Sequence, residues 1–207
     1  MPAPITRALG QMVADISFDA MPPLAIDAAK TATTDGVGIM IDALDMAYLK
    51  RFHATLTTRG VSDEARIYLG SERASAAEAA FINGVAMAAQ DYDDVAFARC
   101  HTTAVMLPSI LAEADAIGAD GRSVIAAYAA GFEVWARIFD YDQDQYPTKG
   151  WHATSAWGAL GAAAAVANLR MHPTLNGTYG GQGWKYRGSL LPLLPARGSL
   201  RHRWPLA

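Results

Sequence analysis

Acidic residues and a histidine gather in one short segment of this 207-residue chain. The stretch QDYDDVAFARCH places Asp91, Asp93 and Asp94 close together, and His101 follows seven residues after the last of them. Carboxylates beside an imidazole can orient a substrate and exchange protons with it near neutral pH. The alternative is a solvated acidic turn whose aspartates cap backbone N–H groups. The segment is therefore a candidate for acid–base chemistry.

A second histidine, His152, directly precedes a small-residue segment with helical spacing, TSAWGALGAAAAVANL. The first turn of a helix offers unpaired N–H groups and the positive end of the helix dipole, which attract a carboxylate ligand. The same dipole disfavours imidazolium, which leaves a neutral ring that can accept a proton. A histidine that only caps or packs at the helix start is the open alternative.

Other chemistry is weakly indicated. The chain contains no pair of histidines at i, i+4 and no HExxH motif, so no metal site is predicted. Cys100 adjoins His101, but sequence neighbours do not define a nucleophile and its base, and a packed thiol is expected. The segment GALGA follows no strand pattern, which argues against a nucleotide-binding loop.

Composition narrows the class of protein and its partners. Apolar residues make up 52% of the chain and charged residues 18%, which is typical of a globular protein whose surface is partly covered by a partner or by another domain. A formal net charge of −3 gives no electrostatic reason to expect nucleic acid or an anionic membrane. A single cysteine and the lack of an apolar run of about 18 residues favour a cytoplasmic protein.

The spacing of apolar residues predicts the elements that carry these groups. A short β-like run is expected at 65–70, and Ser75 with Glu78 matches the S-x-x-E capping box. Thr154 or Ser155 is the expected N-cap of the last helix. Helices are predicted over 5–18, 23–43, 43–60, 75–90, 102–118, 121–140 and 154–169.

The chain changes character near residue 170. All 20 acidic residues lie at or before Asp144, whereas residues 170–207 contain six of the 17 basic residues. The segment GSLLPLLPARGSLRHRWPLA has neither helical nor strand spacing, which predicts a poorly ordered tail. One hypothesis is that this tail is translated out of the original reading frame, and a genuine basic tail is the alternative.

Four segments of the chain occur in one fixed order, and together they are far more specific to a protein family than any one of them alone. They are DGVGIMIDA, AAEAAFINGVAMAAQDYDD, HTTAVMLPSILAEADAIGADGRSVIAAYAAGFEVWARI and KGWHATSAWGALGAAAA, within residues 5–169. Together they resemble the N-terminal part of the MmgE/PrpD family. The resemblance implies an all-α, multi-helix, bundle-like domain over 1–169, a divergent tail over 170–207, and a missing α/β lid domain. It also implies a homodimer and an active site that needs no metal or organic cofactor.

The resemblance assigns roles to individual residues. Asp91 corresponds to the first aspartate of the family's D-[FY]-D-D motif, and His152 matches the histidine before the G-x-L-G-A-A-A-A helix. His101 matches a histidine that usually precedes proline, but Thr102 follows it here. The expected catalytic residues are Asp91, His101 and His152, and the expected substrate-binding residues are Asp94, Thr102 and Thr154.

The implied function is that of a lyase, a dehydratase or decarboxylase acting next to a carboxylate of an acid such as 2-methylcitrate or cis-aconitate. The two histidines are expected to exchange protons with the substrate, while Asp91 orients one imidazole or contacts a substrate hydroxyl. Val95 stands where the decarboxylases have threonine, and Lys185 does not match the family's K-P-L-H-like lysine segment. The chain is therefore expected to be truncated and weakly active or inactive. An epimerase of the same family and a non-catalytic helical dimerisation fragment are the alternatives.

Overall fold

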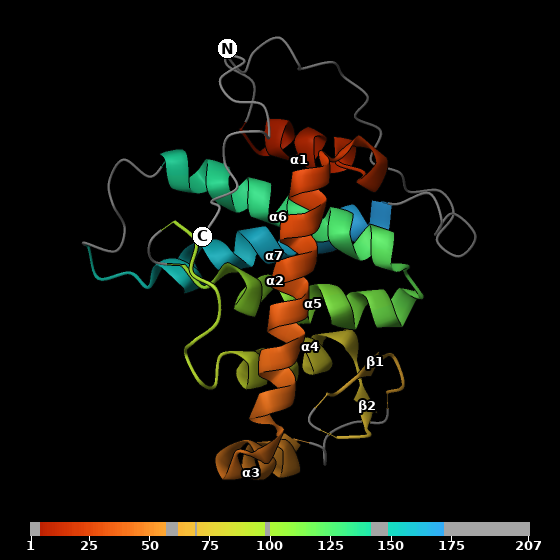
Figure 1. Ribbon diagram of the computed structural model, residues 1–207, viewed down its shortest axis with the longest axis vertical. Helices are drawn as coiled ribbons and strands as arrows, with labels where there is room; N and C mark the ends of the chain where they lie inside the picture. Colours follow the sequence, from red (N-terminus) through yellow and green to blue (C-terminus); the bar gives the residue numbers. More distant parts are fainter. Residues whose placement is uncertain (1–4, 57–61, 69, 98–99, 142–148, 172–207) are drawn as a thin grey trace.

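The computed structural model describes residues 5–56, 62–68, 70–97, 100–141 and 149–171 (Figure 1). Within these residues the fold is all-α, as the helical patterns and the resemblance predict. Short 3-10 turns cover Phe18–Ala20 and Ala43–Asp45, and the two-residue strands β1 (Ala65–Arg66) and β2 (Arg73–Ala74) pair antiparallel. The helices are α1 (Ile5–Asp15), α2 (Pro23–Asp42), α3 (Ala47–Leu56), α4 (Ala76–Met87), α5 (Thr102–Ile117), α6 (Gly121–Tyr141) and α7 (Ala153–Met171).

The predicted elements are present, with shifted boundaries. The helix predicted over 43–60 begins at Ala47, because a 3-10 turn separates it from α2, and residues 57–61 lie outside the described part. Within the described part of the β-like run at 65–70, Ala65 and Arg66 form β1, and residue 69 lies outside the described residues. The Ser75 and Glu78 capping box is present, with both reciprocal contacts formed. Helix α7 continues to Met171, and residues 172–207, nearly all of the predicted tail, lie outside the described residues.

The start of α7 differs from the prediction. The helix begins at Ala153, so Thr154 and Ser155 lie inside its first turn and are not the N-cap. The backbone N–H of Ala156 donates to the carbonyl oxygen of His152 at 2.9 Å, which is the first bond of the helix. His152 therefore occupies the position immediately before α7, as expected from the sequence.

Four helices lie side by side in the order α6, α7, α5, α4, and α2 runs lengthwise across this row (Figure 1). The core between α5, α6 and α7 contains large side chains such as Met106, Trp135 and Leu169, all fully buried. Small residues bring the α6 and α7 backbones close together, because a Cβ added at Gly131 would lie 2.7 Å from the carbonyl oxygen of Gly161. None of the described helices combines the length and the apolar composition that a membrane span requires.

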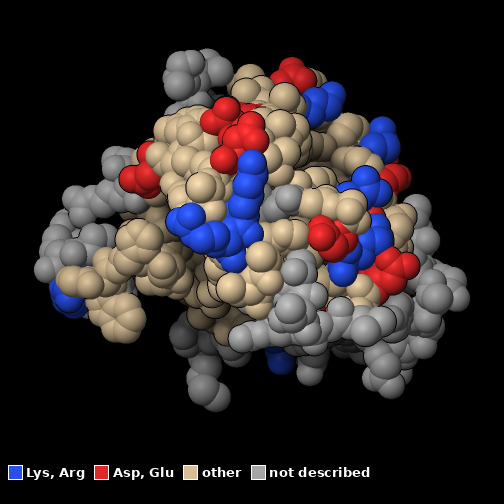
Figure 2. Space-filling model, turned by 90° about the horizontal axis from the view of Figure 1, so that it is seen from below, with Lys and Arg blue, Asp and Glu red and all other residues tan. Residues whose placement is uncertain are grey.

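The described surface carries few charged groups for its size, in line with the 18% of charged residues in the sequence. Figure 2 shows the molecule from the α3 end, where basic and acidic groups are interspersed among uncharged residues. Several charged groups form ion pairs, among them Lys50 with Asp45 at 3.1 Å and Arg73 with Asp115 at 3.2 Å. The Lys50–Asp45 pair is exposed and contributes little to stability, whereas the Arg73–Asp115 pair is half-buried. The described residues of this face therefore offer no single-sign field that would attract a highly charged partner.

Helix α1 packs against α6 through Val13, and the buried amide of Asn168 in α7 also holds it to the bundle. Its Nδ2 donates to the carbonyl oxygens of Val13 and Ile16 at 2.7 and 2.9 Å, at the end of α1. We expect Asn168→Ala to lower the free energy of unfolding by about 1–2 kcal/mol in urea denaturation, because both carbonyls lose their donor. Gln11→Ala, which removes an exposed contact on α1, should change it by less than about 0.5 kcal/mol. Equal losses in the two variants would contradict the attachment.

Candidate active site

The candidate site lies in the segment that connects α4 to α5. This segment leaves α4 after Met87 and enters α5 at Thr102. Asp91 has a φ of 56° and Phe97 a φ of 54°, the left-handed region that aspartate tolerates better than most residues. Ala96 and Cys100 exchange two backbone hydrogen bonds, at 2.8 and 2.9 Å. These bonds join the two ends of a short loop just before His101. The segment is therefore folded back on itself, which brings its carboxylates near its histidine.

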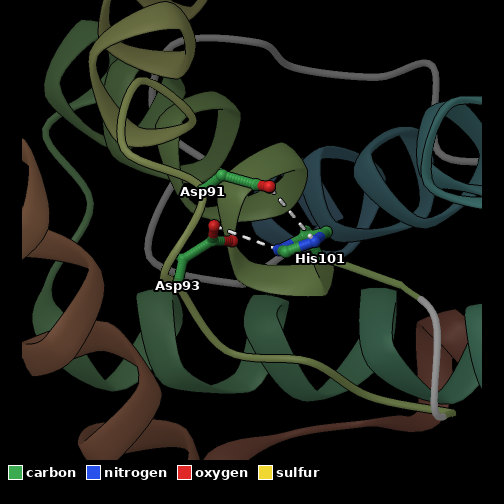
Figure 3. A group of neighbouring side chains, drawn as sticks. All are labelled: Asp91, Asp93 and His101. Atoms are coloured by element: carbon green, nitrogen blue, oxygen red, sulfur yellow. Dashed lines mark hydrogen bonds and ion pairs between the residues drawn. The ribbon is translucent and has the colours of Figure 1, made fainter.

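Two carboxylates flank the imidazole of His101 (Figure 3). Oδ1 of Asp93 lies 3.0 Å from Nδ1, and Oδ1 of Asp91 lies 3.5 Å from Nε2. Asp93 is within hydrogen-bond distance, whereas Asp91 is at the distance of an ion pair. The Asp93 side chain is 2% exposed and the Asp91 side chain is 88% exposed. The two aspartates therefore differ in role: one holds the ring, and the other faces solvent beside it.

The contact with Asp93 determines which ring nitrogen is free to react. An ionised carboxylate can only accept hydrogen bonds, so Nδ1 carries the proton that it donates to Asp93. In the neutral ring this leaves the lone pair on Nε2, on the side of Asp91, where it can take a proton from a substrate. A proton taken up there would lie beside the Asp91 carboxylate. The geometry thus suits His101 to general acid–base chemistry through Nε2.

Burial perturbs the Asp93 carboxyl. Desolvation raises the pKa of Asp93, and the charge of His101 partly offsets this by lowering it. Its second oxygen, Oδ2, is buried and has no hydrogen-bond partner among the described residues. The interaction with His101 therefore opposes the effect of burial on the pKa of this carboxyl.

The titration of Asp93 tests this account. We expect NMR titration of its carboxyl carbon to give a pKa above the value in the unfolded chain, and His101→Ala to raise that pKa further. The contribution of this carboxyl to stability should be full below the unfolded pKa and lost as the pH rises through the folded pKa. A folded-state pKa at or below the unfolded value would contradict the effect of burial.

Asp94, the third aspartate, caps helix α5. Its Oδ1 accepts from the backbone N–H of Thr103 at 3.2 Å, and its Oδ2 accepts from the hydroxyl of Thr102 at 3.0 Å. The hydroxyl of Thr103 bonds to that of Tyr128 at 2.6 Å, and burial raises the pKa of this tyrosine. Asp94 and Thr102 thus hydrogen-bond to each other, and Asp94 also bonds to the backbone at the start of α5. Their predicted contact with substrate stays a prediction.

The first turn of α7 lies against the start of α5. The hydroxyl of Thr154 accepts a hydrogen bond from the backbone N–H of His101 at 3.1 Å. Thr154 is 6% exposed, and a hydroxyl that accepts a hydrogen bond can also donate one. The exposed His152 ring lies 2.7 Å from the hydroxyl of Ser155 in the same turn. Among the described contacts none joins His152 to Asp91 or His101, so the meeting of these three side chains stays a prediction.

The cluster has the composition of a metal site, but its contacts are those of an oriented histidine. One ligand atom from each of Asp91, Asp93 and His101 lies within 4.8 Å of the others. However, the two carboxylates contact different ring nitrogens, and these nitrogens point in different directions. A single ion bound to one nitrogen would not account for both contacts. The arrangement is explained by ion pairing and hydrogen bonding alone.

Asp93 lies in the segment that the sequence marks as a candidate, but neither a catalytic nor a substrate-binding role was predicted for it. The D-x-D-D pattern contains it, but the sequence pattern does not show which aspartate is buried and which is exposed. Val95 is 56% exposed, and Cys100 is buried as expected. The only local signal was the presence of several carboxylates before one histidine.

Comparison with known proteins identifies the family. The model of the MmgE/PrpD N-terminal domain matches residues 7–174. Cis-aconitate decarboxylase of Homo sapiens is 33% identical over 96 residues, which cover 44% of this chain and 20% of that enzyme. Cis-aconitate decarboxylase of Mus musculus is 32% identical over 96 residues, with the same shares. The match spans a fifth of the length of these curated relatives. Because the family model matches most of the length of this chain, the chain belongs to the MmgE/PrpD family through its N-terminal helical domain.

Proposed function

We propose that this domain supplies acid–base groups to a lyase that acts next to a carboxylate of a small di- or tricarboxylic acid. The observation that carries the proposal is the His101 imidazole, held at Nδ1 by buried Asp93 and approached at Nε2 by Asp91. The relatives named cis-aconitate decarboxylase make cis-aconitate the first substrate to test. 2-Methylcitrate is the substrate of the dehydratase alternative.

The proposed chemistry needs a proton acceptor and a proton donor. In a dehydration, a base takes the proton from the carbon next to the carboxylate, the carbon–oxygen bond breaks, and an acid converts the leaving hydroxide to water. In a decarboxylation, the carbon–carbon bond to the carboxylate breaks, carbon dioxide leaves, and the remaining carbanion receives a proton. His101 and His152 take these two roles jointly in our proposal. Asp91 stabilises the charge that appears on His101 or contacts a substrate hydroxyl.

Substrate carboxylates require cationic groups or backbone donors. The start of α7 supports such a role, because His152 immediately precedes it and the helix dipole is positive there. Thr154, which joins this turn to His101, can donate its hydroxyl proton to a substrate oxygen. Asp94 and Thr102 support the site by holding the start of α5 and are kept as substrate-binding candidates. The proposal includes no metal and no organic cofactor.

The position of Val95 is a reason to consider an epimerase as the alternative to the lyase. Its side chain is 56% exposed beside the aspartates, in the place of a polar threonine in the decarboxylases by resemblance. A site without that hydroxyl suits a substrate that lacks the matching contact. An epimerase, which removes a proton from one face of a carbon and returns it to the other, is therefore the alternative within the family.

The test is to follow substrates by ¹H NMR in D₂O. The folded chain is incubated for hours with cis-aconitate, citrate or 2-methylcitrate, and both consumption and deuterium incorporation are recorded. Weak activity that disappears in His101→Ala supports the proposal, and deuterium exchange without consumption favours the epimerase. If no acid is consumed or exchanged, and none perturbs the His101 resonances at millimolar concentration, the proposal fails.

We also propose that the chain forms a homodimer. Large apolar side chains are exposed on several helices, including Ile41 at 58%, Phe81 at 59% and Leu160 at 51%. Apolar groups of this size favour burial against a partner. Sedimentation velocity should give a species of twice the monomer mass. A dimer without any substrate conversion would favour the alternative of a non-catalytic dimerisation fragment.

A further inference from the structure

The residues on either side of Asp91 are anchored to one oxygen atom of α2. Nε2 of Gln90 donates to Oδ2 of Asp42 at 2.6 Å, and the hydroxyl of Tyr92 donates to the same oxygen at 3.0 Å. Asp42 is the last residue of α2 and lies 48 residues before Gln90 in the sequence. The backbone of Asp91 is therefore held at both ends by the same distant carboxylate.

This anchoring explains how Asp91 reaches His101. The side chains of Gln90 and Tyr92 are committed to α2, whereas those of Asp91 and Asp93 point toward the imidazole (Figure 3). Asp91 adopts a φ of 56° between its two anchored neighbours. A non-glycine residue in this region is strained, and the conformation persists where its surroundings hold it. The two bonds to Asp42 supply that restraint.

Asp42 stands where a helix by itself disfavours it. The C-terminal end of a helix dipole is negative, so an aspartate there gains nothing from α2. Hydrogen bonds from Gln90 and then Tyr92 lower the pKa of Asp42, so they favour its charged form. Tyr48 of α3 adds a further anchor, because its hydroxyl donates to the carbonyl oxygen of Ala89 at 3.0 Å. The segment that carries Asp91 is thus tied to both α2 and α3.

We propose that Asp42 is a positioning residue for the candidate active site. Through Gln90 and Tyr92 it keeps Asp91 beside Nε2 of His101, although it does not contact His101 itself. The importance of this geometry for catalysis rests on the proposed function. The geometry itself can be tested without any turnover.

The first test compares Asp42→Ala with Asp45→Ala by NMR of the histidine ring nitrogens. Asp45 is a matched control, because it is an exposed aspartate three residues further on whose ion pair is with Lys50. We expect Asp42→Ala to shift the His101 signals and Asp45→Ala to leave them in place. Tyr92→Phe, which removes one of the two bonds, should give a smaller shift in the same direction. Identical His101 spectra in the wild type and Asp42→Ala would overturn the proposal.

The second test measures substrate conversion. A displaced Asp91 should lower kcat by about tenfold and leave KM within about twofold, since misplacement of a catalytic group affects the chemical step. A shifted His101 spectrum with unchanged kcat would overturn the positioning role. A wild-type protein that neither converts nor exchanges any acid, and whose His101 resonances no acid perturbs, is instead a failure of the proposed function. In that case the NMR comparison still decides whether Asp42 holds the loop.

Discussion

Replacement of His101 by alanine is expected to reduce the conversion or deuterium exchange of the substrate acid by about 100-fold or more, because it removes a general acid–base group. The protein should stay folded, since the ring is partly exposed and its loss leaves the backbone bond to Thr154 in place. The measurement is the initial rate by ¹H NMR, with circular dichroism to confirm the fold. We expect this to be the largest effect on activity of any single side chain in the described site.

A second variant, Asp93→Asn, keeps the His101 ring but changes which of its nitrogens carries the proton. Asp93→Asn keeps a side chain of the same size, but its amide can donate to Nδ1 and so favour the ring form with the proton on Nε2. That form cannot accept a proton at Nε2. We therefore expect a loss of about 10- to 100-fold with His101 still in place.

The matched control is His53→Ala. His53 is in α3, where its Nε2 lies 3.5 Å from a carboxylate oxygen of Glu72. Its loss should leave the rate within about twofold, because it removes no acid–base group of the site. If His101→Ala and His53→Ala had equal rates, the assignment of His101 would be wrong.

Replacement of Gly131 by alanine should cause the largest loss of stability. An added Cβ would lie 2.7 Å from the carbonyl oxygen of Gly161, 2.8 Å from the sulfur of Met106 and 2.9 Å from the Cβ of Ala165. The nearest of these atoms belongs to the backbone of α7, which cannot turn aside as a flexible side chain can. We expect the free energy of unfolding to fall by about 1–3 kcal/mol in urea denaturation, after the gain in helix propensity is subtracted.

Gly38→Ala is the control with the opposite sign. Gly38 lies inside α2, and a Cβ there would meet nothing within 4 Å. The same substitution should therefore raise the free energy of unfolding by about 0.5–1 kcal/mol through helix propensity alone. Stabilisation by both substitutions would show that α6 and α7 do not approach closely at Gly131.

Much of the local structure could be predicted from the sequence. The apolar spacing identified the helices, and Ser75 with Glu78 identified the start of α4, because these features depend on residues within one or two turns of each other. Boundaries were less accurate where a 3-10 turn intervened, as between α2 and α3. The gathering of Asp91, Asp93 and His101 was also visible, because all three lie in one segment of the chain.

The assignment of roles within that segment was decided by tertiary structure. Asp93 is buried and Asp91 exposed because the loop folds over the start of α5, and no local pattern distinguishes them. The bonds of Asp42 with Gln90 and Tyr92, and of Thr154 with His101, join residues about 50 positions apart. Such contacts depend on how whole helices pack, whereas helix formation depends on neighbours in the chain. The sequence thus determined which residue types could do the chemistry, and the packing of α2, α5 and α7 decided which of them meet.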